Sequence, residues 1–364
     1  MLEKIVEPLL LWYPQNARNL PWREMATPYR VWVSEIMLQQ TRVEAVKPFF
    51  ERFITALPEV ADLAVCPEEQ LLKLWEGLGY YNRVRNMQKA AQKIMLEYHG
   101  AMPASYEALL SLPGIGSYTA GAVASIAFGI AVPAVDGNVL RVISRVTASQ
   151  EDIMKQSLRV RMESDLKAIM PGDAPGAFNQ ALMELGATVC VPNGMAKCEV
   201  CPLRSLCLAK SRGIVMELPK KAPKKPRRIE KRTVLIIKNG DKIAIQKRPK
   251  KGLLAGLYEL PNVEGHLSDK AVLKLLKGKQ LPPVRIQKLP PAKHIFSHIE
   301  WQMIGYIIRI EELESKDKEP FIFVEPVKTA EKYPIPAAFS AYMEYLQIKL
   351  GQEKYDEMER QEEV

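Results

Sequence analysis

Residues 111–119 read Ser-Leu-Pro-Gly-Ile-Gly-Ser-Tyr-Thr. Gly114 and Gly116 allow a tight turn, and an apolar run with helical spacing, residues 118–128, follows at once. Such a turn places successive backbone N–H groups at the start of a helix, a geometry that binds a phosphate group. A tight connection between two helices explains the same residues without a ligand. The stretch therefore predicts a helical hairpin, with phosphate binding as one of two interpretations.

The sequence on both sides of this hairpin has a helical pattern. Apolar residues recur at spacings of three and four, with Pro or Gly between the segments. The clearest segments are 29–53, 67–78, 82–98 and 105–112. No alternating strand pattern appears in this half of the chain. We therefore predict an all-α domain over residues 1–215.

The character of the sequence changes after residue 215. Prolines and like charges in 216–232 oppose compact folding and predict a linker. Beyond it, two apolar-rich segments flank Asn239-Gly240, which is typical of a β-hairpin. We expect further strands near 257–263, 298–310 and 320–324, and a final helix over 337–350. The pattern predicts a separate α+β domain over residues 233–364.

The composition limits the class of protein. The chain has 364 residues, a net charge of +9 and a sequence pI of about 9.1. The charge favours a polyanionic partner such as nucleic acid, although an ordinary basic surface explains it equally well. No apolar run is long enough to span a bilayer, and the N-terminus lacks the basic start and cleavage site of a signal peptide. We expect a cytoplasmic protein with no membrane partner.

Four of the five cysteines are close together in the sequence. Cys190, Cys198, Cys201 and Cys207 have the spacing C-x7-C-x2-C-x5-C. In a cytoplasmic protein, so dense a set of thiols favours a soft metal centre over disulfides. Zinc with four thiolates and a [4Fe–4S] cluster both fit the spacing. The spacing predicts a metal centre and leaves its identity open.

A single carboxylate follows the hairpin in a loop rich in Gly and Pro. Asp136 lies in Val-Pro-Ala-Val-Asp-Gly-Asn-Val, where a loop is expected to become a helix. Capping a helix is the ordinary role of such an Asp. The hairpin, Asp136 and the four cysteines, in this order, nevertheless resemble the helix-hairpin-helix DNA glycosylases that carry a [4Fe–4S] cluster.

This resemblance implies a role for each part of the motif. Gly114 and Gly116 would hold the DNA backbone, and Asp136 would act at the sugar. Relatives that also cut the strand, endonuclease III among them, have a lysine where this chain has Tyr118. Since a phenol cannot form the Schiff base of a lyase, Tyr118 predicts a monofunctional enzyme that leaves an abasic site.

Two long stretches are similar to the adenine glycosylases of the MutY type. They are Asn19-Leu-Pro-Trp-Arg-Glu with Pro28-Tyr-Arg-Val-Trp-Val-Ser-Glu-Ile-Met-Leu-Gln-Gln-Thr41, and Trp75-Glu-Gly-Leu-Gly-Tyr-Tyr-Asn-Arg-Val-Arg-Asn86. With the hairpin and cysteines, the similarity covers most of residues 18–207. It implies a base excision repair enzyme that removes adenine mispaired with 8-oxoguanine or guanine in double-stranded DNA. The family commonly has six residues between the first two cysteines, whereas this chain has seven.

Adenine excision needs two carboxyl groups with different protonation states. Adenine leaves readily only after protonation at N7, by an acid whose pKa an apolar site has raised. Glu35 fits this role because its neighbours in Trp32-Val-Ser-Glu-Ile-Met-Leu are apolar, although most helical glutamates are exposed. Asp136, kept ionised, would stabilise or capture the oxocarbenium-like sugar, as the second carboxylate does in retaining glycosidases.

The resemblance assigns further residues around these two acids. They are Tyr118 and Asn138 as supports of the carboxylates, Gln40 and Thr41 as contacts to the DNA at the lesion, Tyr80 as a wedge beside 8-oxoguanine, Arg18, Leu20 and Arg23 as the adenine pocket, and Lys197 and Arg204 as phosphate contacts on the cluster loop. Core packing for Tyr80 and a surface charge for Arg23 are the ordinary alternatives.

Residues 233 to about 350 resemble the Nudix-like domain that completes these glycosylases. The similarity is carried by residues 252–261 and by His294-Ile-Phe-Ser-His-Ile-Glu-Trp301. True Nudix hydrolases hold magnesium with a glutamate-rich helix, but residues 266–277 contain one acid and three lysines. We therefore expect this domain to recognise 8-oxoguanine, through the loop Phe296, Ser297 and His298.

The sequence as a whole predicts an all-α helix-hairpin-helix glycosylase domain with a [4Fe–4S] cluster loop, followed by an α+β Nudix-like domain. We expect a monomer that works on nucleoid DNA. A thymine mismatch glycosylase shares the hairpin, the Asp and the cysteines, but Glu35 and the C-terminal domain argue against it. A DNA-scanning protein without turnover would not need both acids, and a nucleotide hydrolase would need the missing glutamates.

Overall fold

The computed structural model describes residues 2–223, 226–311, 317–318, 320–348 and 350. By its contacts, the chain divides into two compact units. The helical unit comprises Met1–Val65 and Asn82–Lys224, and the C-terminal unit comprises Cys66–Tyr81 and Lys225–Val364. A short segment from the middle of the helical sequence, Cys66–Tyr81, thus packs with the C-terminal residues.

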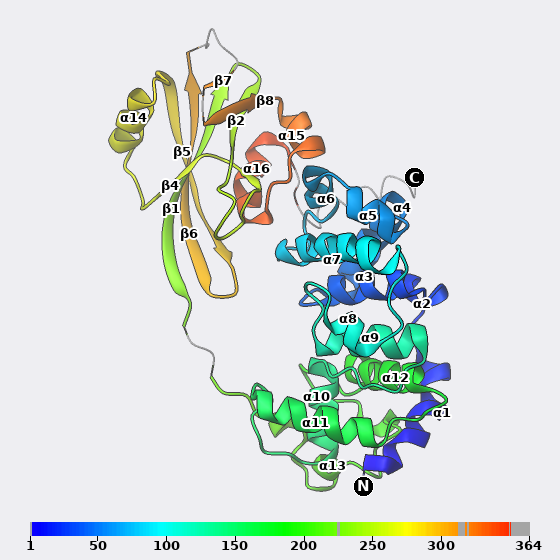
Figure 1. Ribbon diagram of the computed structural model, residues 1–364. Coiled ribbons are helices and arrows are strands. Elements are labelled where there is room, and N and C mark those ends of the chain that lie inside the picture. The colour runs from blue at the N-terminus through cyan, green and yellow to red at the C-terminus, as the bar shows by residue number, and fades with distance from the viewer. Residues whose placement is uncertain (1, 224–225, 312–316, 319, 349, 351–364) are drawn as a thin grey trace, which may run out of the picture. The chain divides into compact units, whose positions relative to one another are not determined.

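The helical unit consists of short and medium helices joined by tight turns (Figure 1). Its α-helices are α1 (Val6–Asn16), α2 (Pro21–Glu24), α3 (Pro28–Leu38), α4 (Val43–Ala56), α5 (Val60–Val65), α7 (Asn82–Tyr98), α8 (Tyr106–Leu110), α9 (Ser117–Phe128), α10 (Gly137–Val146), α11 (Gln156–Ala168), α12 (Pro175–Thr188) and α13 (Leu208–Ser211). Its 3₁₀ helices are η1 (Leu2–Ile5), η2 (Cys198–Val200) and η3 (Val215–Glu217).

The helical prediction for this half is confirmed, with one segment divided. The expected helix over 29–53 is split into α3 and α4 by a turn at Gln40, whose φ is +62°. Thr27 caps α3 by accepting from the Arg30 N–H, and Pro28 occupies the first helical position. Helix α9 also lies very close to the loop that precedes α10, because a Cβ added at Gly121 would lie 2.2 Å from the Pro133 carbonyl oxygen.

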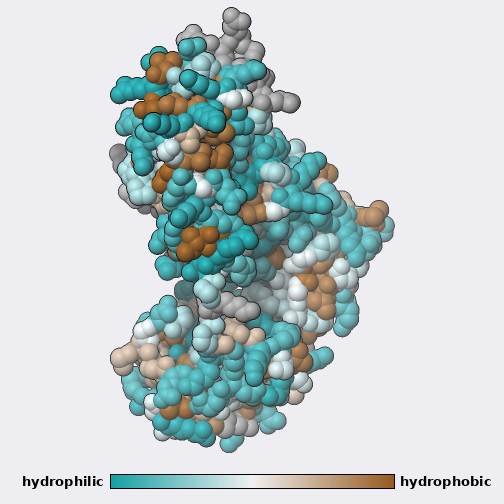
Figure 2. Space-filling model, turned by 90° about the vertical axis from the view of Figure 1, so that its left-hand side faces the viewer, coloured by the Kyte–Doolittle hydropathy of each residue, from teal (hydrophilic) through white to brown (hydrophobic). Residues whose placement is uncertain are grey.

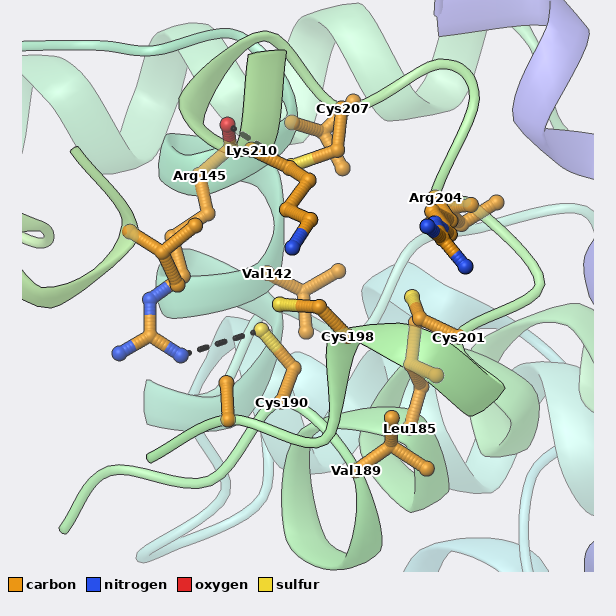
Figure 3. Close-up of a pocket in the computed structure, with 14 residues that line it drawn as sticks. Val142, Arg145, Leu185, Val189, Cys190, Cys198, Cys201, Arg204, Cys207 and Lys210 are labelled. Carbon is orange, nitrogen blue, oxygen red and sulfur yellow. Dashed lines mark hydrogen bonds between the residues drawn. The ribbon is translucent and has the colours of Figure 1, made fainter. Parts of the chain in front are cut away.

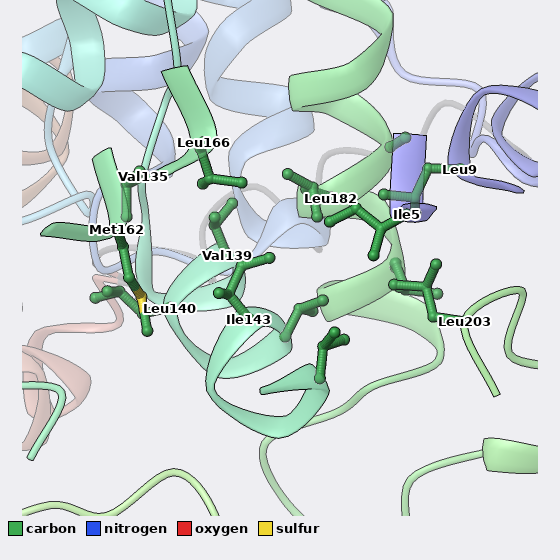
Figure 4. Close-up of a cluster of buried hydrophobic side chains, with 14 of the residues drawn as sticks. Ile5, Leu9, Val135, Val139, Leu140, Ile143, Met162, Leu166, Leu182 and Leu203 are labelled. Carbon is green, nitrogen blue, oxygen red and sulfur yellow. The ribbon is translucent and has the colours of Figure 1, made fainter. Parts of the chain in front are cut away.

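One core of the helical unit forms around α10 and α12 (Figure 4). Apolar side chains of both helices pack against η1, α1 and α11. The labelled members are Ile5, Leu9, Val135, Val139, Leu140, Ile143, Met162, Leu166, Leu182 and Leu203. This packing fixes α10, and therefore Asp136 at its N-cap, relative to α12.

The C-terminal unit is built on a mixed sheet with the strand order β5-β6-β1-β2-β8-β7, to which β3 and β4 add pairs with β2 and β1. The strands are β1 (Arg228–Asn239), β2 (Lys242–Lys247), β3 (Tyr258–Glu259), β4 (Asn262–Glu264), β5 (Pro283–Ile295), β6 (Ile299–Ile310), β7 (Asp317–Lys318) and β8 (Phe321–Val324). The predicted hairpin at Asn239-Gly240 is confirmed as the β1–β2 turn. Strand β1 begins at Arg228, within the expected linker, because it pairs in parallel with β6.

Helices cover both faces of this sheet. Side chains alternate along β1, so Val234 and Ile236 face one core while Leu235 and Ile237 face another. Helix α14 (Asp269–Gly278) covers the second face, and α16 (Ser340–Met343) covers the first (Figure 1). In place of one helix over 337–350, the structure has η4 (Ala337–Phe339), α16 and η5 (Glu344–Leu346). Helices α6 (Glu68–Leu74) and α15 (Pro326–Lys332) complete the unit.

The face of the molecule in Figure 2 is mostly hydrophilic, with small, separate hydrophobic patches. Among the described residues, no helix combines the length and the apolar character needed to cross a membrane.

Candidate active site

Three helices of the helical unit bring together the two predicted acids and the predicted tyrosine. Glu35 lies on α3, Tyr118 in the first turn of α9, and Asp136 at the N-cap of α10. The Tyr118 hydroxyl donates a hydrogen bond to the Glu35 carboxylate. Tyr118 lies 83 positions after Glu35 in the sequence, and Asp136 lies 101 positions after it. The fold brings these three residues together in one site.

Burial controls the protonation of Glu35. Its side chain is only 6% exposed, and removal from water raises its pKa to about 7. The hydrogen bond from Tyr118 opposes this shift, the charge of Asp136 adds to it, and Arg23 opposes it. A carboxyl group with this pKa can hold a proton at neutral pH and release it to a bound base.

Asp136 accepts hydrogen bonds with both carboxylate oxygens. Oδ1 accepts from the Val139 N–H at 2.7 Å, which caps α10, and Oδ2 accepts from Asn138 Nδ2 at 2.7 Å. Burial raises the pKa of Asp136, while these two bonds and the nearby Arg141 guanidinium lower it. The expected capping role and the expected catalytic position therefore coexist in one residue, because capping uses only Oδ1.

Arg141 connects this pair to the cysteine loop and was not predicted from the sequence. Its Nη2 donates to Asn138 Oδ1 and to the Gly186 carbonyl, both at 2.8 Å, and its Nε donates to the Cys190 carbonyl at 2.8 Å. Gly186 permits this approach, since a Cβ there would lie 2.6 Å from the Asn138 Cβ. The signal that could have identified it is its place in the sequence between the apolar residues Val139-Leu140 and Val142-Ile143 of α10.

Arg18 and Arg23 converge on a buried glutamate that was also not predicted. Glu184 is 1% exposed, and it accepts from Arg18 Nε at 2.6 Å and from Arg23 Nη2 at 2.8 Å. Burial alone would raise the pKa of Glu184, but the two guanidinium groups outweigh it and the net shift is downward. Leu20, at the N-cap of α2, is buried beside them in the chain. Glu184 therefore holds two of the three predicted pocket residues, Arg18 and Arg23, in one place.

The hairpin and the end of α3 each contain a turn with a residue of positive φ. Gly114 has a φ of +79°, and Gly116 is the N-cap of α9. Gln40 has a positive φ that is unfavourable without glycine, and Thr41 follows it. Arg83 of α7 holds this turn, because its Nη1 donates to the carbonyls of Ile36 at 2.7 Å, Met37 at 3.2 Å and Gln39 at 2.6 Å.

The four clustered cysteines line one pocket of the helical unit (Figure 3). The pocket walls are apolar, from Val142, Leu185, Val189 and Leu203, and three cations, Arg145, Arg204 and Lys210, also line it. Within the described residues, no group of three or more His, Cys, Asp or Glu has the geometry of a formed metal site. The Cys190 Sγ instead accepts from Arg145 Nη1 at 3.2 Å.

The chemistry of these thiols nevertheless fits a metal cluster. Burial raises the pKa of Cys201 to about 12, and the neighbouring Cys190, Cys207 and Cys198 raise it further. An entering metal cation would convert such thiols to thiolates, because ligation requires the thiolate. The surrounding arginines and lysine would offset the negative charge of a thiolate-ligated cluster. Arg204 is half exposed and forms an ion pair with Glu199 at 2.5 Å.

In the C-terminal unit, the predicted wedge and the predicted recognition loop meet. The Tyr80 hydroxyl lies 2.7 Å from the Ser297 hydroxyl, at hydrogen-bond distance. Phe296 packs edge-on against Trp301, with ring centroids 5.0 Å apart, while Ser297 and His298 are exposed. The single acid of α14, Asp269, accepts from the Tyr306 hydroxyl at 2.9 Å, so it is engaged in the fold.

Family profiles match both parts of the chain. Residues 33–167 match the HhH-GPD superfamily of base excision DNA repair proteins, and residues 232–345 match the NUDIX domain. These matches confirm the predicted helix-hairpin-helix and Nudix-like domains.

Curated relatives span most of the chain. The adenine DNA glycosylase of Mus musculus is 36% identical over 370 residues, which cover 86% of this chain and 72% of the relative. The adenine DNA glycosylase of Buchnera aphidicola from Schizaphis graminum is 33% identical over 303 residues, covering 83% and 86%. Among solved structures, a thermostable thymine-DNA glycosylase is 29% identical with a TM-score of 0.52, covering 58% of this chain and 97% of its own. A non-covalent endonuclease III–DNA complex, 24% identical with a TM-score of 0.50, covers 58% and 96% and shares the fold.

We predict that Tyr118→Phe raises the pKa of Glu35 above about 7. The phenol donates to the ionised carboxylate and so lowers its pKa, and phenylalanine removes this donor without opening the site to water. The measurement is a pH titration of the buried carboxyl stretching band by infrared difference spectroscopy, with Glu35→Gln to assign the band. An unchanged or lower pKa in the phenylalanine variant would contradict the assignment of this hydrogen bond.

Proposed function

We propose that this chain, which belongs to the adenine DNA glycosylase family, removes adenine from its mispairs with 8-oxoguanine and guanine by hydrolysing the N-glycosidic bond. Membership of this family makes it an adenine DNA glycosylase of base excision repair, with DNA as its partner. The observation that carries the more specific proposal is the placement of Glu35 and Asp136 in one site, where Asp136 acts electrostatically on Glu35, Tyr118 donates to Glu35 and Asn138 donates to Asp136. We propose that it acts as a monomer.

In the proposed mechanism, Glu35 is the general acid. The adenine must leave the base stack to reach the buried carboxyl group. Because the pKa of Glu35 is raised to about 7, the group is protonated in a large fraction of molecules at neutral pH. Transfer of its proton to adenine N7 neutralises the leaving group and allows the C1′–N9 bond to break.

Asp136 faces the positive charge that then develops on the sugar. Its two acceptor bonds and the Arg141 guanidinium favour its ionised form against the cost of burial. An ionised carboxylate next to an oxocarbenium-like centre stabilises it, or bonds to it until water completes the hydrolysis. The pKa of Tyr118 is raised well above 10 by burial and by the two acids, so it remains a neutral donor. Because it is no amine nucleophile, strand cleavage is not expected.

We assign the adenine pocket to the group held by Glu184. Arg18, Arg23 and Leu20 lie together there, and Arg23 also acts electrostatically on Glu35. The hairpin amides after Gly114 and Gly116 would hold a DNA phosphate without reading sequence. The strained turn at Gln40 and Thr41 would contact the duplex at the lesion.

The C-terminal unit would distinguish 8-oxoguanine from guanine. Tyr80 and Ser297 share a hydrogen bond and are partly or fully exposed, so both can contact a base. Phe296 and His298 flank Ser297 and complete this loop. Magnesium-dependent hydrolysis has little support here, since the one acid of α14 bonds to Tyr306 and its other charged residues are lysines.

The four cysteines would hold a [4Fe–4S] cluster. The pocket joins four thiols, apolar walls and three cations, which suit a cluster ligated by thiolates. When bound, the cluster would cross-link the loop of residues 190–207 and hold Lys197 and Arg204 for phosphate contacts. The chain itself links this loop to Asn138 through Arg141.

The first expected result is alkali-dependent cleavage at adenine only. In single-turnover assays, duplexes with adenine opposite 8-oxoguanine or guanine should break at the adenine strand after alkali, and a thymine–guanine duplex should not. The rate should fall about tenfold per pH unit above pH 7, as Glu35 loses its proton. Glu35→Gln should slow excision at least about 100-fold, while Glu44→Gln, on an exposed residue, should not. Cleavage without alkali, or at thymine, would contradict this function.

Ser297→Ala should reduce the preference for 8-oxoguanine. Loss of one hydrogen-bonding hydroxyl at the proposed reading site should lower the ratio of excision rates for adenine opposite 8-oxoguanine and opposite guanine by about tenfold. Ser340→Ala, at the start of α16, is a control for the same chemical change in this unit. An unchanged ratio would place recognition at other residues.

The purified protein should be brown and contain about four irons per chain. Cys201→Ser should lose iron and the broad visible absorption of thiolate-to-iron transitions, because it removes one ligand from the pocket. Cys66→Ser, outside the pocket, should retain both. Colourless protein that contains zinc would replace the iron–sulfur assignment with a structural zinc site.

A further inference from the structure

A segment from the helical sequence is fixed within the C-terminal unit by a buried carboxylate. The segment is Cys66–Tyr81, which contains α6 and the turn that carries Tyr80. Its glutamate, Glu76, is 1% exposed. A carboxylate buried to this degree is stable only when its oxygens are paired, so its partners define how the segment is held.

Both oxygens of Glu76 are occupied, and one partner belongs to the C-terminal sequence. Oε1 accepts from the Ile335 backbone N–H at 2.8 Å, and Oε2 accepts from Lys73 Nζ at 2.6 Å. The same Lys73 ammonium donates to the Tyr333 carbonyl at 3.1 Å. The Lys73–Glu76 ion pair therefore binds the backbone of residues 333–335 at two points. Glu76 accepts a hydrogen bond there, and Lys73 donates one.

A second, more exposed contact is made by Glu69, which lies one helical turn before Lys73 on α6. Glu69 Oε1 accepts from Lys247 Nζ at 2.6 Å and from the Tyr258 hydroxyl at 2.9 Å. The hydrogen bond from Lys247 holds the pKa of Glu69 below its usual value. Because both charged groups are about half exposed, this pair is screened and contributes less than the buried one. The ring of Tyr258 packs edge-on against Tyr333, which places both contacts on one surface.

The turn after Glu76 has a backbone that needs such support. Gly77 and Gly79 have φ values of +104° and +67°, and Tyr80 has a φ of +47°. A positive φ at a tyrosine is uncommon and persists only where its surroundings impose it. The Trp75 indole N–H donates to the Gly79 carbonyl at 3.0 Å, which closes the turn. Glu76 is thus the anchored residue from which the turn extends to the Tyr80–Ser297 hydrogen bond.

We propose that Glu76 is a positioning residue for lesion specificity. It binds residues 333–335 and thereby keeps the Tyr80 hydroxyl at Ser297, so the preference for 8-oxoguanine over guanine depends on a carboxylate that touches neither DNA nor the reacting atoms. This inference rests on the proposed function, because it concerns how the proposed reading pair is assembled. A bulkier or shorter side chain at position 76 releases the turn, and Tyr80 then loses its fixed partner.

The test compares single-turnover excision of adenine opposite 8-oxoguanine and opposite guanine in the full-length protein. Glu76→Gln keeps the shape of the side chain and loses its charge, while Glu76→Ala removes both contacts. We expect the ratio of the two rates to fall about tenfold in Glu76→Ala and less in Glu76→Gln, with the rate opposite guanine within about twofold of wild type. Glu331→Gln, on an exposed residue of α15 in the same unit, is the matched control and should not change the ratio.

A double-mutant comparison separates positioning from a general loss of structure. If Glu76 acts through the Tyr80–Ser297 contact, adding Ser297→Ala to Glu76→Ala should lower the ratio no further. Additive losses, or an unchanged ratio in folded Glu76→Gln, would overturn the proposal. Should Glu76→Ala fail to fold, Glu76→Gln combined with Ser297→Ala gives the same comparison.

The wild-type rates test the proposed reading pair separately from the role of Glu76. A wild type with no preference for 8-oxoguanine overturns the proposed reading pair, and with it this inference. A wild type that discriminates, together with Glu76 variants that discriminate equally, overturns only the role of Glu76.

Discussion

The desolvation of two neighbouring carboxyl groups, Glu35 and Asp136, is the constraint on which the helical unit depends. A carboxylate in a dry site is costly unless it is protonated or paired, and the two acids use different solutions. Burial raises the pKa of both acids, that of Glu35 to about 7, and at Asp136 the bonds from Val139 and Asn138 and the Arg141 guanidinium oppose the rise. The three helices α3, α9 and α10 must be packed accurately enough to keep these environments distinct, and the apolar core around α10 and α12 supplies that packing.

Arginines perform much of the remaining positioning in this unit. Arg141 joins Asn138 to the cysteine loop, Arg83 holds the carbonyls at the end of α3, and Arg18 and Arg23 share Glu184. A guanidinium group suits these tasks because its several N–H donors have a fixed planar geometry. Some of the cationic side chains of the chain therefore bond to groups within the protein, and the others are available for binding to DNA phosphates.

The C-terminal unit keeps a NUDIX scaffold, and we propose that it serves recognition rather than hydrolysis. The NUDIX match and the mixed sheet are retained, while α14 presents lysines where magnesium binding needs glutamates. The segment Cys66–Tyr81 is held in this unit by the contacts of Glu76 and Glu69. Tyr80, at the end of this segment, lies at hydrogen-bond distance from Ser297. In the proposed function, the preference for 8-oxoguanine depends on both Tyr80 and Ser297, which are far apart in the sequence.

Short-range patterns in the sequence were sufficient for the helical half and the β-hairpin at Asn239-Gly240, because periodicity, turns and caps are set by neighbouring residues. The family resemblance singled out Tyr118, and together with the chemistry of adenine excision it singled out Glu35 and Asp136. The split between α3 and α4 was missed, since apolar spacing continues across Gln40 while the backbone turns there. The contacts of Arg141 and the pairing of Glu184 with Arg18 and Arg23 were also beyond sequence reasoning, as was the packing of Cys66–Tyr81 with residues 225–364. Whether a charged side chain is buried, and which group pairs with it, depends on segments far apart in the chain, and only tertiary packing brings those segments together.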